Sequence, residues 1–221
     1  MKANSKNLSL LGMLFGICLV IANVVTAKLI PTGIVIFGAE ITLPGAALCY
    51  AITFLITDIV GELWGKEDAN RIVRHGFLGQ LLATGLILLT QYIPAVDPKM
   101  QEAYNALLGQ NWVFVIGSLT AYMISQSWDV WVFHAIRNKY IEKHGSTKGG
   151  RWIWNNLSTM TSQILDTVIF IGISFGLGFG WLFNSEMLPT LAAMMIGQYI
   201  FKFILAILDT PIFYLATRRK S

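Results

Sequence analysis

The stretch Leu8–Ala27, LSLLGMLFGICLVIANVVTA, decides the fold class of this chain, because its 20 residues include no charged side chain. A helix needs about 20 mostly apolar residues to cross a hydrocarbon core of roughly 30 Å. Lys2 and Lys6 precede the stretch, as in a secretory signal peptide, but the apolar run of such a signal has only about 7 to 15 residues. We therefore interpret the stretch as a retained membrane-spanning helix.

Five more apolar windows of this size follow along the chain. Of all 221 residues, 55% are hydrophobic and 13% are charged, whereas a soluble domain carries about 25% charged residues. This composition excludes a soluble enzyme and a disordered chain, and two cysteines exclude a disulfide scaffold. We predict an all-α membrane protein of six transmembrane helices that form a single integral membrane domain over residues 1–221. The predicted helices lie at about 8–27, 44–60, 72–93, 112–133, 157–183 and 188–216.

The basic residues predict the orientation of these helices, since short loops rich in Lys and Arg stay in the cytoplasm. With the N-terminus inside, 13 of the 16 Lys and Arg fall on the cytoplasmic side. Lys28 and Lys99 then lie outside, and Lys202 lies within the last span. Both termini are therefore predicted to be cytoplasmic. Topology explains the net charge of +4, so we expect the lipid bilayer, and no nucleic acid, as a partner.

Two of the predicted external connections have structure of their own. Residues 33–45 contain two β-prone runs, Ile34–Phe37 and Glu40–Leu43, around Gly38-Ala39, which predicts a small hairpin. Such a hairpin could act as a lid over the outer face or be a plain connector. Residues 94–110 continue into a short amphipathic stretch that we expect at the membrane interface.

Several polar side chains lie inside the predicted spans, where a charge costs at least about 2.5 to 3.5 kcal/mol. Asp166 and Lys202 both fall near the middle of helices that a short loop makes antiparallel neighbours, so we predict an ion pair between them. The pair could line a binding site or only hold two helices together. The candidate binding residues are Asn23, Asp58, Glu62, Gln126, Trp128, Asp129, Ser162, Gln163, Asp166 and Lys202.

Alternatives remain open for three of these residues. Asp58 and Glu62 stand one helical turn apart near a loop that carries Arg71 and Arg74, so a cytoplasmic charge lattice also explains them. Trp128 is adjacent to Asp129 and could stack on a flat ring whose edge is read by a carboxylate and amides. Tryptophan also gathers at membrane interfaces as an anchor.

No motif of a membrane enzyme accompanies the polar residues. Asp129 and Asp166 superficially resemble the two carboxylates of an intramembrane aspartyl protease, but the companion Gly-x-Gly-Asp motif is missing. The sequence shows neither a Ser, His and Asp set nor a pattern of His and Cys with metal-ligand spacing. We therefore predict that the protein is not an enzyme and has no catalytic residue, metal or cofactor.

A combination of short motifs resembles a known family over nearly the whole chain. The motifs are TDIVGELWG at 57–65 with Ala69 and Arg71, then Gln126, Asp129, Val132-Phe133 and Arg137, then Ser158, Ser162 and Asp166-Thr167, and finally Lys202. With them the chain resembles the queuosine precursor transporter family, also called the vitamin uptake transporter family. The resemblance implies a six-helix protein of the bacterial inner membrane. It also implies import of 7-deazaguanine bases such as 7-cyano- and 7-aminomethyl-7-deazaguanine, the precursors of a transfer RNA modification.

The resemblance also implies a relation to substrate-binding subunits of energy-coupling-factor vitamin transporters. Those subunits usually dock their energising partner through Ala-x-x-x-Ala on the first helix, where this chain has Gly12 and Gly16. A stand-alone carrier, as a monomer or a homodimer, is therefore our preferred interpretation, and an energy-coupling-factor subunit is the alternative.

The chemistry of a purine-like substrate agrees with the candidate residues. A 7-deazaguanine presents adjacent N–H donors on its pyrimidine edge, which one carboxylate, of Asp166 or Asp129, can accept. Its carbonyl oxygen needs a donor such as the side chain of Gln126, Gln163, Asn23 or Lys202.

Overall fold

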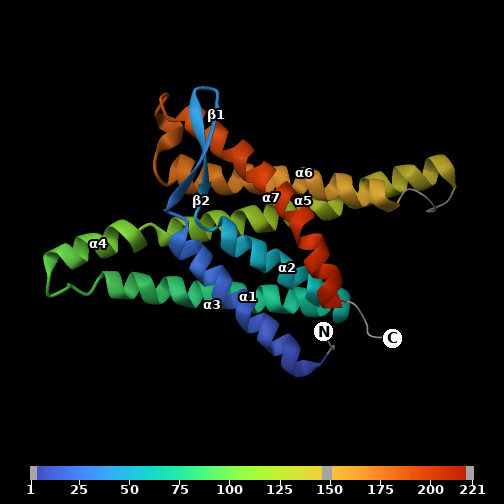
Figure 1. Cartoon of the computed structure of the whole chain (residues 1–221), viewed down its shortest axis with the longest axis horizontal. Helices are drawn as coiled ribbons and strands as arrows, with labels where there is room; N and C mark the ends of the chain where they lie inside the picture. The colour runs from blue at the N-terminus through green and yellow to red at the C-terminus, as the bar shows by residue number, and fades with distance from the viewer. Residues whose placement is uncertain (1–3, 146–150, 218–221) are drawn as a thin grey trace.

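The computed structural model describes residues 4–145 and 151–217 (Figure 1). These residues form seven α-helices, one two-stranded hairpin, a π-helical segment and a 3-10 turn. The α-helices are α1 (Ser5–Val25), α2 (Ala47–Leu63), α3 (Lys66–Gln91), α4 (Pro98–Leu108), α5 (Asn111–His144), α6 (Arg151–Ile171) and α7 (Leu188–Thr217). The remaining elements are β1 (Leu29–Ile36), β2 (Ala39–Pro44), η1 (Gly172–Leu177) and η2 (Trp181–Phe183).

Several helices are long and apolar enough to cross a membrane. Within the described residues, five stretches meet this criterion, and they lie in Ser5–Val25, Lys66–Gln91, Pro98–His144, Asn156–Leu177 and Leu188–Leu205. The predicted class of an all-α membrane protein is therefore confirmed, with the small hairpin as its only β element among these residues. Helix α2 has 17 residues and is not among the five.

Every predicted window contains a helix, but several boundaries differ; α3 and α6 begin at Lys66 and Arg151, ahead of the predicted starts at 72 and 157, and two ends differ for clear reasons. Helix α5 continues past residue 133 for a total of 34 residues, until Gly145 adopts a left-handed conformation with φ of 66° that ends it. The window 157–183 is too long at its end, because the spanning stretch of α6 and the π-helix η1 ends at Leu177 and the chain turns at Gly180. This region contains the glycines 172, 176, 178 and 180, and glycine disfavours a continuous α-helix.

Buried apolar side chains form two clusters, one in each half of the chain. We call α1–α3 the N-terminal group and α5–α7 the C-terminal group; in Figure 1 α1 and α3 lie in the lower part, α5 and α6 lie in the upper part, and α7 runs from the upper part down to the lower part. Gly76 lets α3 approach α1 closely, because a Cβ at this position would overlap the ring of Phe15. The first cluster is Leu11, Phe15, Leu19, Ile56, Ile59, Val60 and Ile72, and the second is Phe114, Ala121, Phe170, Ile171, Phe175, Leu191 and Met194.

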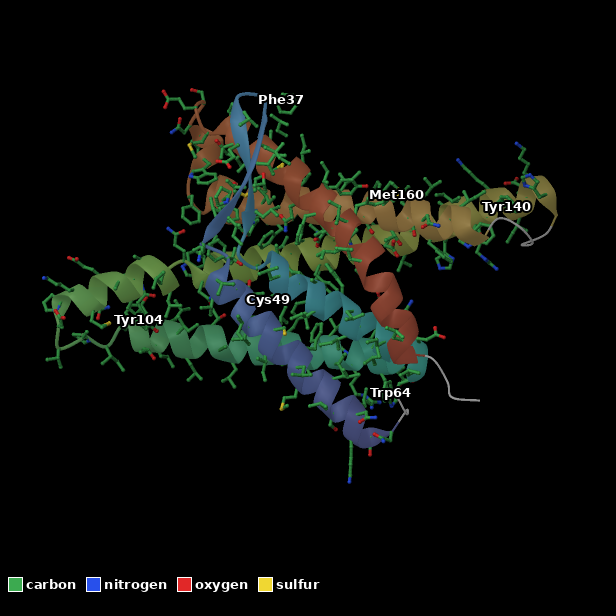
Figure 2. All side chains as sticks on the ribbon, in the orientation of Figure 1. Phe37, Cys49, Trp64, Tyr104, Tyr140 and Met160 are labelled. Atoms are coloured by element: carbon green, nitrogen blue, oxygen red, sulfur yellow. The ribbon has the colours of Figure 1, made fainter. Side chains whose placement is uncertain are left out.

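The predicted hairpin is confirmed, with its turn one residue earlier than expected. Phe37 and Gly38 occupy the turn with φ of 51° and 77°, and two positive values are what a type I′ turn requires. Strand β2 lies against α7, where buried Ile41 fills the space that a Cβ on Gly197 would need. The hairpin is thus anchored to α7, while its tip at Phe37 points away from the helices (Figure 2).

The connection after α3 contains the short helix α4. The Asp97 side chain accepts a hydrogen bond from the Lys99 N–H and caps the helix, and the Tyr104 hydroxyl donates to Ile87 O over 2.9 Å. No residue of α4 is fully buried. The helix lies beside the end of α3, far from the end of α5 that carries Tyr140 (Figures 1 and 2). Its place at the membrane interface stays a prediction.

Candidate functional site

A cavity of about 360 Å³ lies between the N-terminal and the C-terminal groups of helices. Its volume falls in the range of small-molecule sites. The N-terminal group supplies a largely apolar and aromatic wall without a charged side chain, which consists of Phe15, Leu19, Tyr50, Thr53, Phe54, Thr57, Ala69, Asn70, Val73 and Phe77. The C-terminal group supplies a polar wall, which consists of Ser118, Ala121, Tyr122, Ser125, Gln126, Asp129, Thr159, Ser162, Gln163, Asp166, Phe170, Gln198 and Lys202.

The polar wall contains the same five-residue pattern twice. Residues 125–129 of α5 read Ser-Gln-x-x-Asp, and so do residues 162–166 of α6; we call them the α5 turn and the α6 turn. The two turns face each other reciprocally. Ser125 Oγ lies 3.4 Å from Asp166 Oδ1, and Ser162 Oγ lies 3.3 Å from Asp129 Oδ1. The two helices therefore present two serine–carboxylate contacts to the cavity, one helical turn apart.

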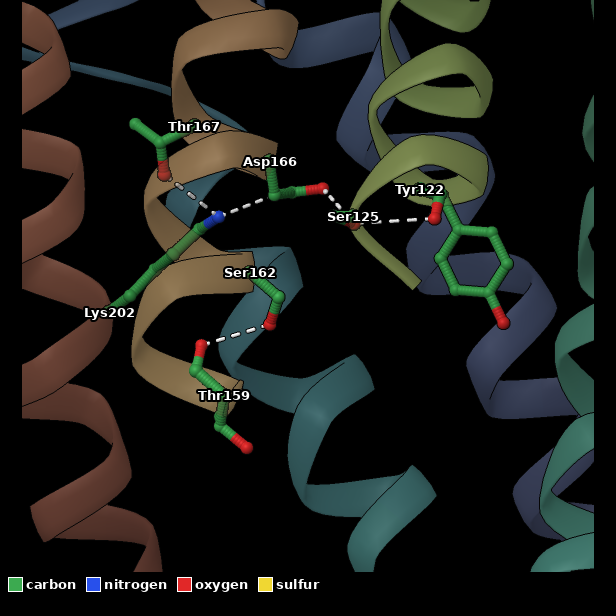
Figure 3. A network of polar contacts seen from close by, with 7 residues as sticks. All are labelled: Tyr122, Ser125, Thr159, Ser162, Asp166, Thr167 and Lys202. Carbon is green, nitrogen blue, oxygen red and sulfur yellow. Dashed lines mark hydrogen bonds and ion pairs between the residues drawn. The ribbon is translucent and has the colours of Figure 1, made fainter. Parts of the chain in front are cut away.

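Both serine hydroxyls are shared with their own helix. Ser125 Oγ is also 3.3 Å from Tyr122 O, and Ser162 Oγ is 3.0 Å from Thr159 O (Figure 3). Each hydroxyl has one proton, and both contacts to the carboxylates are long for an O–H···O bond, whose usual range is about 2.5 to 3.0 Å. Asp129 and Asp166 therefore keep the capacity to accept hydrogen bonds from a bound molecule.

The two turns differ in charge compensation. Lys202 Nζ of α7 lies 2.6 Å from Asp166 Oδ2 and 3.2 Å from Thr167 Oγ1 (Figure 3). The predicted ion pair is thus confirmed, and the side chains of Lys202 and Asp166 are only 11% and 26% exposed. Among the described residues, no basic side chain forms a salt bridge with Asp129.

Two amide groups of the polar wall lack hydrogen-bond partners. The Oε1 atoms of Gln163 and Gln198 are buried and accept no hydrogen bond within the described chain. Gln198 is 3% exposed and stands one turn before Lys202 on α7. An unsatisfied buried polar group costs about 1 to 3 kcal/mol, so N–H donors of a bound molecule would relieve this cost.

Aromatic rings from both walls line part of the cavity. Tyr50 stacks on Phe54 and meets Phe170 edge-on, with ring centroids 6.4 Å apart in both pairs. Phe77 and Tyr122 make an edge contact at 4.9 Å. Rings in such arrangements offer flat apolar faces, which suit a planar heterocyclic ligand.

Six of the ten predicted site residues line the cavity, and the other four lie elsewhere. Those that line it are Gln126, Asp129, Ser162, Gln163, Asp166 and Lys202. Trp128 is not among the lining residues, and its side chain is 41% exposed, packs on Trp131 and donates to Thr161 Oγ1 over 3.2 Å. Trp128 therefore does not border the cavity, whereas four aromatic rings of the N-terminal group do.

The other three residues outside the cavity lie on α1 and α2. Asn23 is fully buried, but its amide nitrogen donates to Leu19 O of the same helix over 3.1 Å, and its side chain does not reach the cavity. Asp58 and Glu62 are exposed on α2 and also lie outside the lining. Their positions agree with the alternative of charges at a membrane surface.

Sequence patterns alone do not single out Tyr50 and Phe170, since aromatic side chains occur throughout the apolar spans. The structure adds these residues to the site. One usable signal is the repeat of Ser-Gln-x-x-Asp in two consecutive helices, which brings both serines and both carboxylates to one interface.

Apolar helices around a polar internal cavity define a multi-pass membrane protein of the small-molecule transporter class. Comparison with known families gives the same class, because residues 44–216 match the family described as "Putative vitamin uptake transporter". The chain belongs to this family. Membership in a transporter family also confirms the prediction that the protein is not an enzyme.

A relative from Bacillus subtilis (strain 168) extends the comparison to nearly the whole chain. It is named "Probable queuosine precursor transporter" and is 29% identical over 207 residues, which cover 92% of this chain and 81% of the relative. No solved structure matches the chain.

Proposed function

We propose that this protein imports queuosine precursors, namely 7-deazaguanine bases such as 7-cyano- and 7-aminomethyl-7-deazaguanine, across the bacterial inner membrane. The observation that carries the proposal is a cavity with an aromatic wall facing a polar wall rich in acceptors. A flat base with several N–H donors is complementary to both walls. The name of the Bacillus subtilis relative supports the same substrate class.

The recognition chemistry follows from the polar wall. The adjacent N–H groups on the pyrimidine edge of the base donate to the Asp166 carboxylate, which Lys202 holds in place. The carbonyl oxygen of the base accepts a hydrogen bond from an amide nitrogen of Gln163 or Gln198, or from Lys202. The ring of the base lies against Tyr50 and Phe54. In the polar wall, the aromatic rings are those of Tyr122 and Phe170.

The proposed topology has six crossings: the five long apolar stretches and, in addition, α2. A helix of 17 residues is about 25 Å long, which is close to the thickness of the hydrocarbon core. The start of α1 and the end of α7 lie toward the same end of the bundle, as an even number of crossings requires (Figure 1). With the positive-inside rule, both termini are cytoplasmic. Reporter fusions after α7 and within α4 should give opposite signals, and equal signals would contradict six crossings.

Uptake of a labelled precursor tests the function directly. Cells that lack their own transporter receive the protein, with and without an energising module, and the Asp166→Asn variant serves as the matched control. Uptake in both backgrounds supports a stand-alone carrier. Uptake that needs the module supports the alternative of an energy-coupling-factor subunit. Absence of uptake in every background contradicts the proposed function.

A further inference from the structure

The charges that line the cavity do not balance. Asp129 and Asp166 contribute two carboxylates, and Lys202 contributes the only cationic side chain among the lining residues. Lys202 contacts Asp166 directly over 2.6 Å, so the uncompensated charge belongs to Asp129. The described contact of Asp129 is the Ser162 hydroxyl at 3.3 Å, which supplies a dipole but no charge. Asp129 is half-buried, and a positive partner stabilises a carboxylate that is partly withdrawn from water.

Two amide oxygens of the polar wall also lack a hydrogen-bond donor. The buried Oε1 atoms of Gln163 and Gln198 accept no bond from the described residues. This observation is independent of the charge balance, because both amides are neutral. A ligand that brings a positive charge together with several N–H groups would supply both missing features at once.

We propose that Asp129 is the counter-ion of a protonated amine on the substrate, so that the cavity prefers a 7-deazaguanine with an aminomethyl group to one with an uncharged nitrile. The inference rests on the proposed function and adds the part of the substrate that the α5 turn recognises. The two serine–carboxylate contacts are one helical turn, about 6 Å, apart along the helix axes. A bicyclic base whose pyrimidine edge lies at Asp166 therefore extends its opposite edge toward Asp129.

A proton could compensate Asp129 in place of a ligand amine, so the test must separate the two. The other titratable groups that line the cavity are Tyr50 of α2, Tyr122 of α5, Asp166 of α6 and Lys202 of α7; the lining residues of α1 and α3 include none. An aliphatic amine, like that of lysine, stays protonated at neutral pH. Binding through a ligand ammonium is therefore insensitive to pH near neutrality.

The experiment measures binding of 7-aminomethyl- and 7-cyano-7-deazaguanine to the purified full chain between about pH 6 and 8, where an aliphatic amine is protonated throughout. The two ligands share one ring and differ only in the charged substituent. The wild type should bind the aminomethyl base at least about tenfold more tightly, a difference of about 1.4 kcal/mol. Asp129→Asn should weaken binding of this base about tenfold and change binding of the nitrile less than about twofold.

Glu142→Gln is the matched control, since it removes an exposed carboxylate from the same helix outside the cavity. It should leave both affinities unchanged. Equal binding of the two bases to the wild type overturns the inference, and this comparison holds even if Asp129→Asn does not fold. A preference that survives Asp129→Asn also overturns it. So does nitrile binding that weakens as the pH rises and loses this dependence in Asp129→Asn, because that result assigns a proton. If neither base binds, the proposed function itself is contradicted.

Discussion

The α5 turn and the α6 turn have the same residue types at the same spacing, and each serine reaches the carboxylate of the other turn. Their surroundings differ. Helix α7 places Lys202 against Asp166, while Asp129 receives no such partner within the described chain. Because of this third helix, two equal local patterns contain one carboxylate with a salt bridge, Asp166, and one without a salt bridge among the described residues, Asp129. The comparison teaches that the charge state of the cavity depends on α7 and cannot be deduced from either turn alone.

The largest expected effect comes from breaking the α6 turn. Asp166→Asn replaces an acceptor with a group that presents a donor to the donors of the base, and it leaves Lys202 without its carboxylate. Precursor binding should weaken by at least about thirtyfold, or about 2 kcal/mol, with expression largely retained. Equilibrium binding to purified protein measures this loss. Unchanged affinity would indicate that the α5 turn, and not the α6 turn, binds the pyrimidine edge.

The next test removes the asymmetry between the turns. Lys202→Met leaves the half-buried Asp166 without a cation and should lower stability by up to about 3 kcal/mol. Combining it with Asp166→Leu should restore stability, because apolar replacement of a buried pair is often neutral or better. Thermal unfolding and precursor uptake are measured for both single variants and the double variant. A stable double variant without uptake places the pair in the substrate site, whereas a stable double variant that still transports reduces Lys202 to a packing role.

A smaller difference should separate the two serines. Ser162→Ala removes the described hydrogen bond to Asp129, whereas Ser125→Ala leaves Asp166 held by Lys202. We expect precursor binding to weaken about fivefold, or about 1 kcal/mol, for Ser162→Ala and about twofold or less for Ser125→Ala. Titration of both variants with the same precursor gives the ratio. An equal or reversed ratio would show that Lys202 does not distinguish the turns.

The smallest effect belongs to a residue inside the α5 turn that points away from the cavity. Trp128→Phe loses only an exposed hydrogen bond to Thr161, so precursor affinity should change less than about twofold. Phe77→Leu in the aromatic wall is the contrasting variant and should weaken binding about fivefold, since an aromatic contact contributes about 1 kcal/mol. A larger effect of Trp128→Phe than of Phe77→Leu would contradict the assignment of the aromatic wall.

The sequence predicts those features that depth and composition determine. Each residue of a helix advances the chain by 1.5 Å, so Asp166 and Lys202 can be placed at similar depth, and their ion pair follows. Apolar windows locate the helices, because the hydrocarbon core admits few other structures. The β-prone runs on either side of Gly38 likewise predict the hairpin.

Other features depend on rotation and packing, which composition does not reveal. Trp128 is next to Asp129 in the sequence, but adjacent residues of a helix point about 100° apart, so one faces the cavity and the other does not. The end of α6 is also hidden from composition, since Gly172–Leu177 is as apolar as the helix before it. The aromatic wall combines Tyr50 and Phe77 from separate helices, and only their packing brings these rings to one surface.

The contact between Ile41 and Gly197 connects the hairpin mechanically to the polar wall of the cavity. Ile41 occupies the space beside a residue that has no side chain, and the next residue of α7 is Gln198, whose amide lines the cavity. A displacement of α7 on loading or release of substrate would therefore carry the hairpin with it. Because Phe37 is 72% exposed at the tip of the hairpin, a fluorescent or spin label at this position would report movements of α7. Movements of α7 could then be timed at the hairpin tip, without altering any group that lines the cavity.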